Sequence, residues 1–68
     1  MSAYKIIEVV GTSSKSWEDA TQQAISSASK SLRNLRIAEV VKTDATVDAK
    51  GKIKEYRARV ALSFKYDA

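Results

Sequence analysis

The pattern of apolar and polar positions changes its period twice along the chain. The first stretch, 3–10, is rich in β-branched and aromatic residues, with Ile6 and Val10 on one parity and Ile7 and Val9 on the other. This arrangement predicts a β-strand whose two faces are both covered. In so short a chain, a second covered face indicates contact with something beyond the chain itself.

A helix is predicted after a turn at 11–15. Ser16 is a suitable N-cap, and Asp19 lies three residues later, where its carboxylate could return a hydrogen bond to the backbone of Ser16. Apolar residues at three- and four-residue steps then form one narrow, alanine-rich stripe, namely Trp17, Ala20, Ala24, Ala28, Leu32 and Leu35. Such a helix can lie close to a sheet, although it buries little surface by itself.

Two extended segments, 36–48 and 52–66, follow the helix. The loop 49–51 between them fits a three-residue hairpin that ends in a left-handed glycine, Gly51, and places Asp48 opposite Lys52. Continued along the strands, this register gives one face the pairs Arg36–Phe64, Ala38–Leu62 and Val40–Val60, and the other face the pairs Ile37–Ser63, Glu39–Ala61, Val41–Arg59 and Thr43–Arg57.

The predicted fold is therefore α+β, a single domain over 1–68 with the order β-α-β-β. One helix packs on one face of a three-stranded antiparallel sheet. The last strand, 52–66, is much longer than a typical strand and outruns what one short helix can cover. The other sheet face and a long sheet edge are predicted to need partners.

Composition favours association with copies of the same chain. A domain of 68 residues is usually marginal alone and relies on disulfides, a metal or a partner. The chain contains no cysteine and no histidine, which excludes disulfides and thiolate or imidazole metal sites. The same absences remove the usual catalytic base and the readiest nucleophile, so we predict that the protein is not an enzyme.

The charge leaves two kinds of partner open. The net charge of +4 points to an anionic ligand or to nucleic acid, yet eight acidic residues are interspersed among twelve basic ones, as on an ordinary soluble surface. A nucleic-acid-binding module is therefore kept as an alternative to a ligand-binding oligomer. It ranks second because the chain has no aromatic-basic RNA-binding strand and no helix-turn-helix. It also has no signal-peptide pattern and no apolar run of about 20 residues, which predicts a cytoplasmic protein without a membrane partner.

Four segments together resemble the dodecin family. They are 4–13 (YKIIEVVGTS), 16–20 (SWEDA), 38–40 (AEV) and 56–64 (YRARVALSF). The resemblance covers nearly the whole chain in the family's element order. It implies a hollow homododecamer with helices outside and sheets facing the interior, in which many members bind stacked pairs of flavins and so store a small ligand.

The chain departs from the flavin-binding members at both of their specific positions. Ile37 stands where a tryptophan stacks on the flavin ring, and Arg57 follows Tyr56 where a glutamine bonds the ring's polar edge. Isoleucine has no π-face, and arginine donates hydrogen bonds without accepting them. The chain is thus more similar to members that lack the flavin residues, such as the calcium dodecins.

The candidate ligand-binding residues are Ile37, Arg57 and Arg59, which the predicted register places on one sheet face as pocket-lining positions. Arg57, Arg59 and Lys65 share that face, where they would contact a ligand or pair with Glu39 and Glu55 of neighbouring chains. The oxygen ligands that calcium needs could come from Glu39, Asp44, Asp48 and Glu55, but these lack EF-hand spacing and no metal ligand is assigned. The identity of the ligand is not determined by the sequence: Ile37 and Arg57 argue against flavin, and calcium and coenzyme A are the other candidates. A purely structural oligomer without a ligand is a further alternative.

Overall fold

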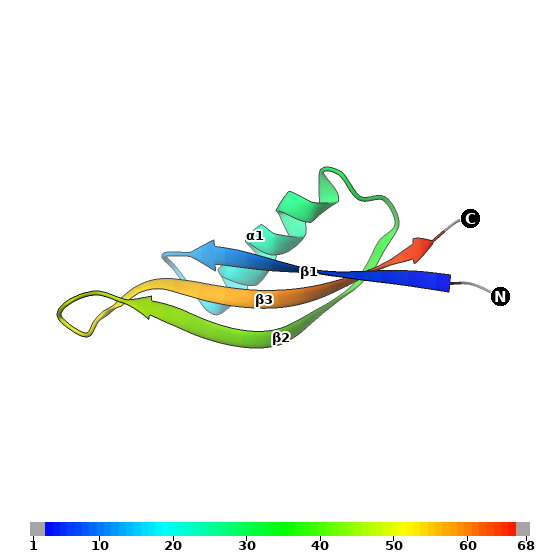
Figure 1. Ribbon diagram of the computed structural model, residues 1–68. Coiled ribbons are helices and arrows are strands. Elements are labelled where there is room, and N and C mark those ends of the chain that lie inside the picture. Colours follow the sequence, from blue (N-terminus) through cyan, green and yellow to red (C-terminus); the bar gives the residue numbers. More distant parts are fainter. Residues whose placement is uncertain (1–2, 67–68) are drawn as a thin grey trace.

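The computed structural model describes residues 3–66, and within them the predicted β-α-β-β fold is confirmed. The elements are β1 (Ala3–Ser13), α1 (Trp17–Ser29), β2 (Leu35–Val47) and β3 (Ile53–Tyr66). The strands form one antiparallel sheet in the order β1-β3-β2, and α1 lies against one side of it (Figure 1). The long β3 strand is therefore central, while β1 and β2 are the sheet edges.

The core between helix and sheet is built from small residues. Every fourth helix residue and every second residue of β3 meet there, so the buried cluster consists of Ala20, Ala24, Ala28, Ala58, Val60 and Leu62. The largest fully buried side chains are Leu62 and Val60. A core this small stabilises the subunit weakly, as the alanine-rich stripe predicts.

Gly11 allows the helix to approach the sheet closely. A Cβ added at Gly11 would overlap the carbonyl oxygen of Ala20 and lie 2.8 Å from the backbone nitrogen of Ala24. The prediction that a turn begins at Gly11 is wrong, because β1 continues to Ser13 and runs beneath the first turns of α1. Gly11 is a packing position within a strand, and no side chain larger than hydrogen fits there.

The helix start is only partly as predicted. Ser16 is the N-cap, and its hydroxyl accepts a hydrogen bond from the backbone N–H of Asp19 at 2.9 Å. The Asp19 carboxylate accepts from the hydroxyl of Ser13 at 2.6 Å, where a bond from the Ser16 N–H was predicted. The Ser13 hydroxyl in turn accepts from the backbone N–H of Lys15 at 2.9 Å, so the end of β1 is tied to the helix start.

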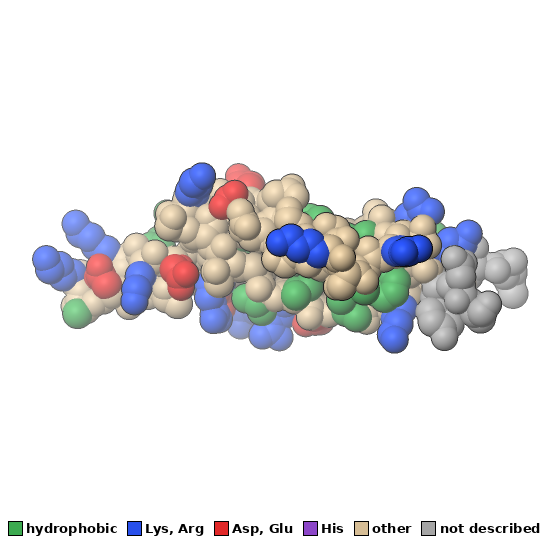
Figure 2. Space-filling model, turned by 90° about the horizontal axis from the view of Figure 1, so that it is seen from above, with side chains coloured by type: hydrophobic (Ala, Val, Ile, Leu, Met, Phe, Trp, Pro, Cys, Tyr) green, Lys and Arg blue, Asp and Glu red, His purple; other side chains and the backbone are tan. Residues whose placement is uncertain are grey.

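The hairpin closes as predicted. The Asp48 N–H donates to the Lys52 carbonyl at 2.9 Å, the Gly51 N–H donates to the Asp48 carbonyl at 3.0 Å, and Gly51 has a φ of 78°. The Asp48 carboxylate also accepts from the N–H groups of Lys50 and Lys52, which holds the loop together. Figure 2 shows basic side chains gathered at this hairpin end, in a molecule whose Cα extents are 52 × 19 × 14 Å.

The register between β2 and β3 differs from the predicted one in three places. From Thr46 to Lys42 the strands are shifted by one residue, because the pairing slips between Thr46 and Val47, so Arg57 lies opposite Asp44, where Thr43 was predicted. Arg59 likewise lies opposite Lys42, where Val41 was predicted, and near the far end Phe64 pairs with Leu35 in place of Arg36. The pairs predicted between these shifts, Ile37–Ser63, Ala38–Leu62, Glu39–Ala61 and Val40–Val60, are confirmed. The bulge at Val41 absorbs the shift, which keeps the core face in register.

Candidate functional site

The sheet face opposite α1, which we call the uncovered face, is organised in rows across the three strands. Partners in the register share a face, and residues two apart along a strand lie about 6.6 Å from each other on it. From the chain termini toward the hairpin, these are an isoleucine row (Ile6, Ser63, Ile37), an acidic row (Glu8, Ala61, Glu39), a basic row (Val10, Arg59, Lys42) and an Arg57 row (Thr12, Arg57, Asp44).

The isoleucine row is an apolar surface open to solvent in the single subunit. Ile6 is 63% exposed, Ile37 is 60% exposed, and the neighbouring Tyr4 is 54% exposed. Three large apolar side chains in one place are typical of a surface that another molecule covers. Ile37, one of the predicted ligand-binding residues, lies here.

A shallow pocket lies between the strands at the other end of the uncovered face. It is lined by Val10, Lys42, Asp44, Arg57 and Arg59, so it holds two of the three predicted site residues. Its interior volume of about 10 Å³ is far below the roughly 300–1,000 Å³ of a typical small-molecule site. In one subunit the pocket can therefore hold about one water-sized group, such as a single oxygen of a ligand, and not a whole cofactor.

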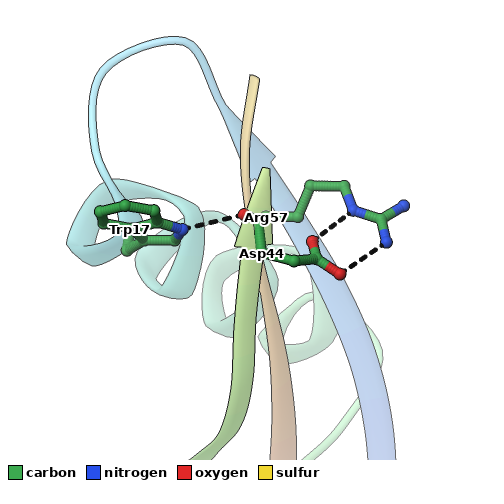
Figure 3. Close-up of polar contacts among 3 residues, drawn as sticks. All are labelled: Trp17, Asp44 and Arg57. Atoms are coloured by element: carbon green, nitrogen blue, oxygen red, sulfur yellow. Dashed lines mark hydrogen bonds and ion pairs between the residues drawn. The ribbon is translucent and has the colours of Figure 1, made fainter. Parts of the chain in front are cut away.

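Asp44 and Arg57 form a two-pronged ion pair at this pocket. The Arg57 Nε donates to Asp44 Oδ1 at 2.7 Å, and Nη2 donates to Oδ2 at 2.9 Å (Figure 3). The hydrogen bonds from Arg57 lower the pKa of Asp44 below its ordinary value of 3.8, and this effect exceeds the opposing effect of burial. The same hydrogen bonds raise the pKa of Arg57. Both side chains therefore stay charged at neutral pH and hold each other in a fixed plane.

Trp17 connects the helix start to this ion pair through the backbone. Its indole N–H donates to the carbonyl oxygen of Asp44 at 2.9 Å, and its ring packs edge-on against Tyr56 with centroids 4.8 Å apart. Figure 3 shows the indole on one side of β2 and the carboxylate and guanidinium groups on the other. Trp17 was predicted to be a packing residue of the helix stripe, and no sequence pattern indicated its hydrogen bond to β2.

Arg59 is held much more loosely than Arg57. Its Nη1 lies 3.8 Å from Glu8 Oε1, and both side chains are more than half exposed. Exposed ion pairs at such distances contribute little to stability, so Arg59 is free to contact another group. Lys42 lies directly opposite Arg59 in the register and is also exposed, which gives this row two adjacent cations.

The uncovered face carries all three predicted site residues, but a single subunit does not bring them together. Ile37 pairs with Ser63, six residues along β3 from Arg57, which corresponds to about 20 Å. A compact ligand can contact Ile37 and Arg57 together only if they come from different copies of the chain. Sequence reasoning placed Asp44 among the calcium candidates and missed Lys42, because the register shift between Thr46 and Val47 pairs Asp44 with Arg57 and Lys42 with Arg59.

The carboxylates considered for calcium do not converge in the subunit. Within residues 3–66, no group of three or more His, Cys, Asp or Glu residues is placed to hold a metal ion. Asp44 is engaged by Arg57, and Asp48 closes the hairpin. Because calcium takes about six to eight oxygen ligands, a calcium site here would need carboxylates from more than one chain.

The fold and the uncovered face define a class of small α+β proteins in which one helix covers one side of a three-stranded sheet. The family model for Dodecin matches residues 3–67, and the chain belongs to the dodecin family. Calcium dodecin from Mycobacterium tuberculosis is 45% identical over 65 residues, which cover 96% of this chain and 90% of that protein. Within residues 3–66, no helix is long and apolar enough to cross a membrane.

Solved structures show the same arrangement. Dodecin from Streptomyces coelicolor has a TM-score of 0.92 at 28% identity, covering 98% of this chain and 94% of that one. The calcium dodecin structure from Mycobacterium tuberculosis has a TM-score of 0.83 at 42% identity, covering 96% and 91%, and is described as calcium-chelating with a novel calcium-binding site. Calcium binding is a property of that protein, and the ligand of the present chain has to be argued from its own residues.

Proposed function

We propose that this chain is the subunit of a hollow homododecamer that binds and stores a small ligand in the cytoplasm, without catalysing a reaction. The observation that carries the proposal is the uncovered face, where an exposed isoleucine row lies beside acidic and basic rows. The small alanine-rich core adds support, because a subunit this thin gains most of its burial from neighbours.

Charge complementarity favours a second copy of the chain as the partner of this face. The acidic row presents Glu8 and Glu39, and the next row presents Arg59 and Lys42. A copy related by a two-fold axis can set the acidic row of one subunit beside the basic row of the other, whereas Arg57 lies one row further along and stays open to a ligand. The same alternation argues against nucleic acid, since acidic side chains interrupt the basic surface that a phosphate backbone would follow.

Native mass spectrometry of protein purified without added ligand tests this proposal. We expect a twelve-chain species, and mass in excess of twelve chains would identify a retained ligand. A monomer or dimer at micromolar concentration would refute the assembly. An intact dodecamer that shows no excess mass and no thermal shift with flavins, calcium or coenzyme A would point to a structural oligomer.

Flavin binding is expected to be weak because of Ile37 and to rise when an aromatic ring is restored. The substitution Ile37→Trp gives the uncovered face a π-surface, and each stacked ring should tighten riboflavin binding by about three- to tenfold. Quenching of riboflavin fluorescence during titration measures this change. Ile53→Trp, at an exposed position on the hairpin, is the matched control and should change nothing. Equal quenching by wild type and Ile37→Trp would show that position 37 does not contact the flavin.

A further inference from the structure

The basic side chains that line the pocket around Arg57 indicate which charge the ligand has. We propose that Arg57, Arg59 and Lys42 form a binding site for the phosphate or diphosphate group of the ligand. This inference rests on the proposed ligand-binding function and specifies the chemical class that the uncovered face accepts.

The charges that line the pocket favour an anion. The lining contains Lys42, Arg57 and Arg59 and one carboxylate, Asp44, so it carries a net charge of +2, and Glu8 lies outside the lining, 3.8 Å from Arg59. A calcium ion brought into this pocket would meet three cations and a carboxylate that Arg57 already engages. A group with two or more negative charges would instead be attracted by all three basic side chains.

Arg57 has hydrogen-bond donors to spare for such a group. A guanidinium has five N–H donors in a rigid plane, and Asp44 accepts from two of them. The three others are outside the ion pair, and the pair fixes the direction in which they point. The Arg57 side chain is about two fifths exposed, so a ligand can reach it from the uncovered face. Tetrahedral phosphate oxygens match this planar fork well.

The position of Asp44 is itself fixed from behind. The Trp17 indole holds the Asp44 carbonyl at 2.9 Å from the helix side, while the carboxylate projects toward the uncovered face (Figure 3). Trp17 is thus a positioning residue for the anion site, since it acts through Asp44 on Arg57. The pocket itself admits about one water-sized group, so the anion would rest on its open side with one oxygen inserted, and the remainder of the ligand would lie between subunits.

Isothermal titration calorimetry with sodium pyrophosphate tests the site on the assembled protein. Arg57→Gln and Lys42→Gln should each weaken pyrophosphate binding, Arg57→Gln by about tenfold or more, because each removes a charged donor. Asp44→Asn removes the carboxylate charge of the pocket lining and keeps one oxygen that can accept from Arg57, so binding should stay equal or tighten. Arg33→Gln, an exposed arginine in the connection between α1 and β2, is the matched control and should bind as wild type does.

The opposite effects of Arg57→Gln and Asp44→Asn separate this site from a structural ion pair. Loss of pyrophosphate binding in both variants, or in neither, would overturn the inference. Heat on addition of calcium chloride, with none on addition of pyrophosphate, would overturn it as well. Native mass spectrometry of the same samples separates the two levels of the proposal: an intact, ligand-binding dodecamer that ignores pyrophosphate refutes the anion site alone, whereas a monomer refutes the proposed function.

Discussion

Replacing Gly11 with alanine is expected to abolish the folded subunit. The added Cβ would overlap the carbonyl oxygen of Ala20 and lie 2.8 Å from the nitrogen of Ala24, so two backbone groups of α1 would have to move. A helix backbone cannot change rotamer to make room, and the helix would lift from the sheet along the alanine contacts. We expect a loss of about 3 kcal/mol or more in the free energy of unfolding, which a small domain does not tolerate. Soluble yield and the thermal unfolding midpoint measure the effect.

Gly51→Ala is the matched control for this experiment. Gly51 has a φ of 78° but open space around the position of a Cβ, so the substitution costs only the left-handed backbone preference, about 1 kcal/mol. The two variants make the same chemical change and separate close packing from backbone conformation. A Gly11→Ala protein that melts near the wild-type midpoint would mean that α1 lies farther from β1 than the structure places it.

The elements and the core of this fold follow from local sequence pattern. Ser16 marks the helix start, the alanine stripe marks the face that meets the sheet, and Gly51 marks the hairpin, and all three are observed. These features depend on the backbone preferences and periodicity of neighbouring residues. The end of β1 was harder to predict from the sequence. Whether Gly11 turns the chain or lets a helix pass close above it depends on tertiary packing and not on neighbouring residues.

The pocket could be predicted only in part, and the reason is the register shift between Thr46 and Val47, close to the hairpin. Arg57 and Arg59 were identified because residues of one parity along β3 share a face. Their partners Lys42 and Asp44 could not be assigned, since the shift between Thr46 and Val47 moves each pairing by one position until the bulge at Val41 reverses it. A hairpin loop fixes the register where it closes, but bulges further along the strands leave no clear sequence signal.

Membership of the dodecin family determines the fold of this chain, but it does not determine which ligand the chain binds. Function in such a fold depends on the residues that line the site and not on the architecture. In the site proposed for this chain those residues are Ile37 at the apolar end and Arg57 with Lys42 at the charged end, about 20 Å apart. Ligand contact at both ends by one compact molecule therefore requires a neighbouring copy, which makes assembly a precondition of the complete site.

Ile6→Lys is expected to break the assembly while leaving the isolated subunit intact. Ile6 is 63% exposed in the single chain, so a charged side chain there meets solvent, and the nearby Glu8 even favours it. In the proposed dodecamer, the same ammonium group would be buried in the apolar contact made by the isoleucine row. Burying it costs about 2 kcal/mol or more in each subunit, repeated twelve times. Native mass spectrometry should therefore show monomers or dimers in place of the twelve-chain species.

Gln23→Lys adds the same charge on the exposed side of α1 and should leave the dodecamer unchanged. Circular dichroism of the dissociated Ile6→Lys protein distinguishes lost assembly from lost folding, and retained β-sheet and helix signals are expected at low temperature. Because the core is small, we also expect a lower thermal midpoint once the neighbours are gone. A dodecamer that accepts lysine at position 6 would show that the isoleucine row faces the hollow interior, and the contact between copies would then have to lie along the edges formed by β1 and β2.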